Sequence, residues 1–130
     1  MILDDLKEYL DGSGVSEGAK VFLNYDAATA REDVVVLMLC GSSVSDVGEK
    51  AVVRVSVKCT LMQDAERIAH GVFDLFYPKK QYQRLMDICG SKMYILAGGV
   101  PFYSHRDESG RHCFVSVSYT HLTLPTILRV

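Results

Sequence analysis

The chain has no tryptophan, only three prolines and no long hydrophobic run. Its longest wholly apolar stretch, Val34 to Cys40, is far shorter than the roughly 20 residues that a membrane-spanning helix needs. The first residues, MILDDLKEYL, include acidic side chains where a secretory signal peptide has a basic start and an apolar segment. These absences predict a protein that is made and folded in the cytoplasm and that does not enter a membrane.

An excess of positive charge is also absent. The formal net charge at pH 7 is −2, and the basic side chains cluster at Lys79, Lys80 and Arg84 alone. Proteins that bind nucleic acid through its phosphates need a clustered Lys/Arg surface. We therefore expect no direct sequence-specific binding of nucleic acid, and we interpret the three cations as a solvated turn.

The cysteines do not pair in sequence. Cys40, Cys59, Cys89 and Cys113 are widely separated and form no Cys-x-x-Cys motif. Without a sign of secretion, such spacing is typical of reduced thiols that are mostly buried.

Catalytic and metal-binding patterns are missing as well. His105, His112 and Cys113 lie close in sequence, but a structural zinc site needs four ligands, and no second Cys/His cluster supplies the others. The stretch that starts at Cys40 lacks the Gly-x-x-x-x-Gly-Lys-Ser/Thr pattern of a phosphate-binding loop. We predict that the protein is not an enzyme and that it has no catalytic residue, no cofactor and no metal site.

Hydrophobic periodicity divides the chain into short elements. A helix is predicted first, then three strands, a second helix, a short helical turn and two strands. The corresponding ranges are residues 2–11, 20–25, 34–40, 53–58, 60–77, 81–88, 92–97 and 111–116. Gly41 to Lys50 is predicted as a loop, and Asp107 to Gly110 as a hairpin turn. Because the first strands are joined by short connections, we predict an α+β domain with a mainly antiparallel sheet and its helices packed on one face.

The third strand has one apolar and one polar face. Its valines alternate with Arg54, Ser56 and Lys58, a pattern typical of a strand with one face on the core. The polar face is either open to water or covered by a neighbouring subunit. If a subunit covers it, Arg54 and Lys58 are candidate assembly residues.

The second helix has clear start and stop signals. Thr60 and Gln63 have the spacing of a capping box at its start, and Pro78 prevents its continuation. The predicted buried stripe consists of Ala65, Ile68, Ala69, Val72, Phe73 and Phe76.

The end of the chain resembles a cloning artefact. Residues 117–126, VSYTHLTLPT, match one reading frame of a common transposon-based sequencing adapter. A natural final strand with genuine β propensity is the alternative. If the match is causal, residues 1–116 form the α+β domain and residues 117–130 are a non-native tail. Those 116 residues hold thirteen cations and sixteen carboxylates, a net charge of −3.

One stretch resembles a known family. An alternating strand runs directly into a helix that contains AERIAHGVFDLFY, and PFYSHRDESGRHCFVSVS follows after a linker and a strand. This order resembles the minor capsid proteins of tailed bacteriophages that act as tail terminators. That family has the form Pro-x-Tyr-x-x-Arg-Asp-x-x-Gly-Arg, and the matching residues are Pro101, Tyr103, Arg106, Asp107, Gly110 and Arg111. The family usually has glycine at the position of His105.

The resemblance implies structural work in a virion. Such proteins assemble as a homo-oligomeric ring, commonly a hexamer, at the end of the tail tube, where they stop tube growth and join the tail to the head. The implied partners are other copies of the chain and phage tail-tube and neck proteins. The implied location is the tail or neck of the virion, after assembly in the bacterial host cytoplasm. The alternative is an α+β ligand-binding domain or a small enzyme, which a concave cluster of titratable residues would indicate.

We predict that residues 117–130 are foreign to the natural gene, because of the adapter match. Resequencing the source locus should give a different continuation after about Ser116. Finding the same codons in an independently prepared library would contradict the prediction.

Overall fold

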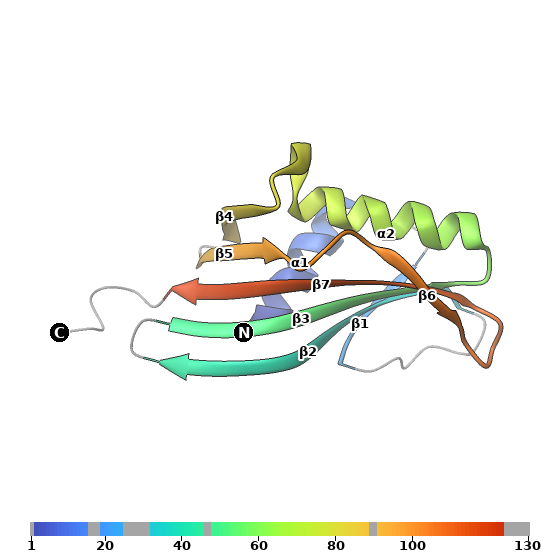
Figure 1. The fold of residues 1–130 in the computed structure, drawn as a ribbon, viewed down its shortest axis with the longest axis horizontal. Coiled ribbons are helices and arrows are strands. Elements are labelled where there is room, and N and C mark those ends of the chain that lie inside the picture. Colours follow the sequence, from blue (N-terminus) through green and yellow to red (C-terminus); the bar gives the residue numbers. More distant parts are fainter. Residues whose placement is uncertain (1, 16–18, 25–31, 46–47, 89–90, 124–130) are drawn as a thin grey trace.

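The structure is a computed structural model that describes residues 2–15, 19–24, 32–45, 48–88 and 91–123. Figure 1 shows the arrangement of its helices and strands. The elements are α1 (Ile2–Ser13), β1 (Lys20–Leu23), β2 (Val34–Ser45), β3 (Gly48–Cys59), α2 (Met62–Phe76), the short 3-10 helix η1 (Pro78–Lys80), β4 (Gln83–Ile88), β5 (Ser91–Ala97), β6 (Phe102–Arg106) and β7 (His112–Thr123). None of the helices in these ranges is long and apolar enough to cross a membrane.

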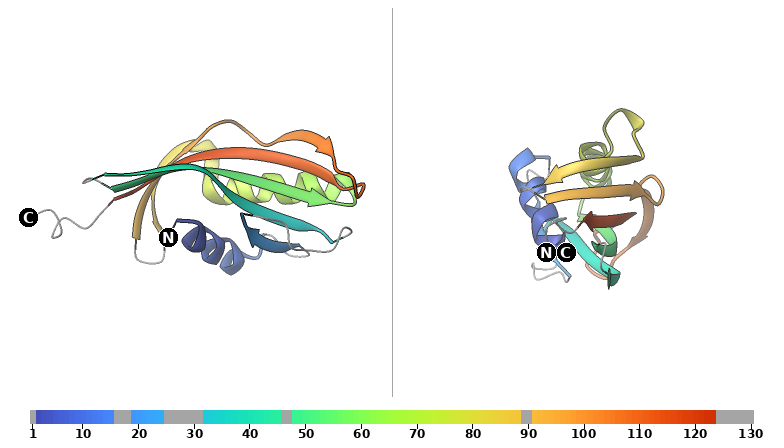
Figure 2. Two further views of the ribbon diagram at one scale, coloured as in Figure 1. Left: turned by 90° about the horizontal axis from the view of Figure 1, so that it is seen from below. Right: turned by 90° about the vertical axis from the view of Figure 1, so that its left-hand side faces the viewer.

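The strands form one sheet in the order β1-β2-β3-β7-β5-β4, and β6 pairs with β7. Within the described ranges β1 and β2 run parallel, and all other strand pairs are antiparallel. Both helices lie on one side of the sheet (Figure 2). The predicted α+β class, with a mainly antiparallel sheet and helices on one face, is confirmed.

The core lies between this sheet and the two helices. The apolar positions of β3, among them Val53, Val55 and Val57, are buried beneath α2. The buried residues of α2 are the six that periodicity predicts, and Leu3, Leu6 and Leu10 of α1 complete the layer. Each Val, Leu, Ile or Phe side chain among them contributes about 1.5–3 kcal/mol when fully buried, so packing of the helices on the sheet stabilises the fold.

Strands β2 and β3 are longer than the sequence predicts. The loop predicted over Gly41 to Lys50 is wrong, because β2 continues to Ser45 and β3 starts at Gly48. Hydrogen bonds between paired strands join backbone atoms. A segment rich in serine and glycine can therefore continue a strand that is already paired with its neighbour. A register shift between Leu39 and Gly41 marks a bulge at Cys40.

The segment after α2 also differs from the prediction. The helical turn predicted over Gln81 to Ile88 is wrong, because this segment forms strand β4 at the sheet edge. Lys79 and Lys80 of η1 have φ values of 55° and 62°, a left-handed conformation that turns the chain back after α2. The next strand then pairs with β5, and the amide of Ala97 donates to the carbonyl of Tyr82 at 2.7 Å.

The predicted capping box at the start of α2 is wrong. The N-cap residue is Leu61, in an extended conformation, and no side chain caps the helix. The amide of Thr60 instead donates to Oδ1 of Asp33 at 3.1 Å. Thr60 therefore ties the end of β3 to the start of β2 and does not cap α2.

Strand β7 continues beyond Ser116 to Thr123 and pairs with both β3 and β5. The hairpin turn at Asp107–Gly110 is confirmed, and the stretch before it contains the additional strand β6. Residues 117–123 of the proposed tail therefore lie in the sheet, and residues 124–130, including Pro125, lie outside the described residues.

The part of β7 that belongs to the proposed tail places polar side chains in the core. The hydroxyl of Tyr77, a residue only 2% exposed, donates to Oγ of Ser118 at 2.7 Å. Oγ1 of Thr120 donates to the carbonyl of Ala51 at 3.2 Å. A void of about 10 Å³ lies beside them, lined also by Val53 and Ile95. The core is thus polar and slightly underfilled at this point.

We predict that Ser118→Val combined with Tyr77→Phe leaves the protein at least as stable as the original chain. The double change removes both hydrogen-bonding partners and adds methyl groups beside the void. Ser118→Val alone should cost about 1–3 kcal/mol, because it leaves the buried Tyr77 hydroxyl without a partner. Urea unfolding of the two variants measures the difference. Equal stability of the single and double variants would contradict this account.

Candidate functional site

Six candidate residues from the sequence lie in or beside the hairpin of β6 and β7. Pro101 is buried just before β6. The Tyr103 ring stands edge-on to Phe114, with centroids 5.5 Å apart, and its hydroxyl lies 3.2 Å from Nδ1 of His112. Nε of Arg106 donates to the carbonyl of Gly110 at 3.2 Å. These contacts hold the two strands together.

Asp107 organises the turn itself. Its Oδ1 accepts the amides of Ser109 at 3.0 Å and Arg111 at 2.8 Å. The amide of Gly110 donates to the carbonyl of Asp107, and Gly110 has a φ of 85°, which glycine adopts without steric cost. The aspartate and the glycine of the motif therefore have local structural roles.

Arg111 connects this turn to a distant part of the chain. Its Nε donates to Oδ2 of Asp107 at 2.8 Å, and its Nη1 donates to the carbonyl of Glu32 at 3.0 Å. The residue is only 5% exposed. Because Glu32 lies just before β2, the guanidinium links the β6–β7 turn to the start of β2, 79 residues away.

The ion pair with Arg111 lowers the pKa of Asp107. Desolvation alone would raise the pKa, but the hydrogen bonds and charge of Arg111 outweigh it and hold the pKa below its ordinary value. The ionised carboxylate is thus the form that the fold stabilises.

Two of the cysteines, Cys59 and Cys113, are buried thiols. Burial, with a smaller effect from Asp33, raises the pKa of Cys59 to about 12, and burial also raises the pKa of Cys113. A thiol must lose its proton to act as a nucleophile, so these two are inert at neutral pH. Cys40 is exposed, and Cys89 lies outside the described residues.

The three residues considered above for a metal site do not come together on one face of the hairpin. His105 and Cys113 are register partners across the hairpin, whereas His112 contacts Tyr103 on the opposite face of β7. No group of three or more His, Cys, Asp or Glu side chains suited to a metal ion occurs in the described part of the chain.

The polar face of β3 differs from the open surface considered above. Ser56 is only 9% exposed and lies between Val36 and Val115 of the paired strands. Arg54 is half-buried: its Nη2 lies 3.1 Å from Sδ of Met38, and its Nε is buried without a hydrogen-bond partner. Of the two alternatives for this face, the one that leaves it open to water therefore applies only in part. A charge reversal at Arg54 would disturb the fold.

The exposed apolar surface lies elsewhere, on what we call the outer face, the side of the sheet opposite α1 and α2. Leu85, Tyr94 and Leu96 alternate with the buried residues of β4 and β5 and are 39–61% exposed. Beside them is a hollow of about 600 Å³, here called the outer hollow. Its lining includes Lys50, Val52, Tyr94 and Leu96, together with Tyr119, Thr120 and His121 from the proposed tail.

The outer hollow was not predicted from the sequence. One signal was available, because MYILA in β5 is apolar on both faces, and a strand covered on one side only should alternate. The hollow also needs residues from β3, β5 and β7, which a sequence alone does not bring together.

Comparisons with known proteins find a similar fold. No protein-family model and no curated protein matches the chain. A solved chain from the "Virion of native gene transfer agent (GTA) particle" is similar, with a TM-score of 0.53 and 12% identity over 92% of each chain. At this identity the likeness shows that the two chains share a fold.

We predict that Asp107→Asn lowers stability at pH 7 by roughly 3 kcal/mol, the cost of removing one partner of a buried ion pair. The stabilisation by Asp107 is present above its unfolded pKa, about 3.9, and is lost as the pH falls through its lowered folded pKa. The gap between the two proteins should therefore shrink at low pH in urea unfolding.

The control for this prediction is Glu108→Gln, an exposed carboxylate in the same turn. It should change stability little at either pH. A gap between Asp107→Asn and the original chain that is equal at pH 7 and at about pH 3 would contradict the ion-pair account.

Proposed function

We propose that the chain is a structural subunit of a phage-like virion, and more narrowly a tail-terminator or head–tail joining protein that forms a ring at the end of the tail tube. The single observation that carries the coarser proposal is the fold shared with a gene transfer agent virion chain over 92% of both proteins. The narrower role rests on the resemblance of Pro101 to Arg111 to the tail-terminator motif.

The hairpin contacts support this reading of the motif. Tyr103, Asp107 and Arg111 fix the hairpin shape and tie it to the start of β2. A rigid, exposed hairpin suits a surface that must meet a partner without reorganising, because ordering costs are then small. Pro101 to Arg111 would thus act in assembly by holding a shape.

A ligand-binding domain is the second candidate, since the outer hollow is large enough for a small molecule. Its lining offers few polar groups that could orient a small molecule, and one of them, His121, belongs to the proposed tail. We therefore favour a protein contact at this surface.

The test is tube assembly with the tail-tube protein encoded beside this gene in its source genome. The purified chain should bind tube ends in negative-stain electron microscopy and shorten the tubes in proportion to its concentration. Arg111→Met should weaken this effect by about tenfold, because the hairpin loses its link to β2. Tubes of unchanged length with bare ends would overturn the proposed role.

The locus gives an independent check of the same proposal. Neighbouring genes for capsid, tail-tube and tape-measure proteins are expected. A locus of metabolic genes, together with saturable binding of a small molecule in the outer hollow, would favour the second candidate.

A further inference from the structure

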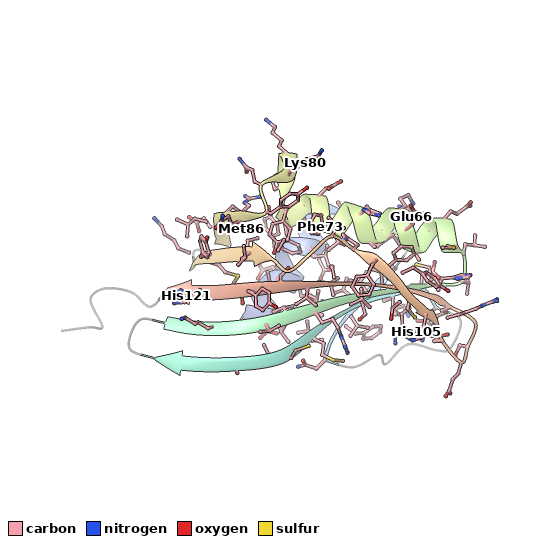
Figure 3. All side chains as sticks on the ribbon, in the orientation of Figure 1. Glu66, Phe73, Lys80, Met86, His105 and His121 are labelled. Carbon is pink, nitrogen blue, oxygen red and sulfur yellow. The ribbon has the colours of Figure 1, made fainter. Side chains whose placement is uncertain are left out.

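Two exposed apolar features lie at opposite ends of the molecule. One is the outer hollow, lined by Lys50, Val52, Tyr94 and Leu96 among others. The other is the corner where β3 passes into α2, at Leu61 and Met62, which are 54% and 46% exposed. Figure 3 shows this separation: Glu66, one turn into α2, is at one end, and His121, which lines the outer hollow, is at the other.

The Leu61–Met62 corner is apolar at its tip and acidic behind it. Met62 and Glu66 are four residues apart and lie on the same side of α2. The Glu66 side chain is exposed, so a partner that covers Met62 also meets a carboxylate.

The two sides of the molecule carry opposite charge. On the outer face of β2, β3, β7, β5 and β4, the described side chains include four cations and one carboxylate: Lys50, Arg54, Lys58, Lys92 and Asp87. Helices α1 and α2 carry seven carboxylates and two cations: Asp4, Asp5, Glu8, Asp11, Asp64, Glu66, Asp74, Lys7 and Arg67. The chain is therefore complementary to a second copy of itself, the sheet side of one facing the helix side of the next.

We propose that the outer hollow of one copy receives the Leu61–Met62 corner of a second copy. The apolar tip would cover Val52 and Leu96, and Glu66 would approach Lys50, which is exposed at the rim. The occupant fits because it is apolar where the lining is apolar and acidic where the surrounding face is basic.

This contact joins two different patches and is heterologous. Repeated from copy to copy, a heterologous contact closes into a ring or continues as a filament, depending on the rotation per copy. The inference rests on the proposed function, which requires a ring, and names the surface that would build it. The residues at the centre of the proposed contact, Lys50, Val52, Leu96 and Met62, all precede the proposed tail.

The test is sedimentation equilibrium of the full chain from roughly 1 µM to 1 mM, a range suited to a weak contact. Leu96→Gln and Met62→Gln should each weaken self-association by about tenfold, because both remove apolar contact at partly exposed positions. Lys50→Glu and Glu66→Lys should each weaken it as well. The Lys50→Glu/Glu66→Lys double variant should regain association, since its charges are exchanged.

Two control variants separate this contact from general effects. Val100→Gln removes an exposed apolar side chain outside both patches, and Lys80→Glu reverses an exposed charge outside them. Neither should change association. Circular dichroism of every variant should show the original fold.

The outcomes distinguish this inference from the proposed function. Association that is unaffected by all four single variants would overturn the inference and leave the ring open to another surface. A strict monomer across the range would also overturn it, and tube-end binding would then decide the proposed function by itself. Failure of the double variant to regain association would overturn the pairing of Lys50 with Glu66.

Discussion

The structure depends on the pairing of three long strands. β2, β3 and β7 are twelve residues each, and β3 is paired along its length with the other two. Because side chains alternate along a strand, this pairing determines which side chains face the helices. It also determines which side chains lie on the outer face. The buried valines of β3, the buried Ser56 and the outer hollow all follow from this one register.

The link made by Arg111 explains how the ends of these strands stay in place. The first residues of β2, Val34 to Leu37, are almost fully buried, and the β6–β7 turn projects from the sheet in Figure 1. The guanidinium joins Asp107 and the carbonyl of Glu32 in a nearly water-free position, where a charged hydrogen bond is stronger than in water. A motif that resembles a phage family thus has a physical role within a single chain.

The sequence predicted elements where one periodicity dominated. The buried stripe of α2 is correct to the residue, because its apolar positions have a clear helical spacing. The segment QRLMDI was assigned to the wrong class because its few apolar residues suit a helical turn as well as a short strand, and its pairing with β5 decided the outcome. The extended ends of β2 and β3 were missed because their backbone pairing overrides a loop-like composition.

The candidate site was predicted only in part. Pro101 to Arg111 were singled out by motif, but the contact of Arg111 with Glu32 spans 79 residues and has no sequence signature. The outer hollow joins strands that are distant in sequence, and three of its lining residues belong to a segment that resembles adapter DNA. Ser118 and Thr120 of that segment bring hydrogen-bonded polar groups into the core.

The most direct test of the account is quantitative mass spectrometry of particles purified from the source strain. The account predicts that this chain is present in every particle preparation. Its molar ratio to the tail-tube protein should be constant and should correspond to one ring of this chain per tail. It also predicts peptides that match residues 1–116 and then diverge. Particles that contain capsid and tube proteins but none of this chain would contradict the claim that it is a virion subunit.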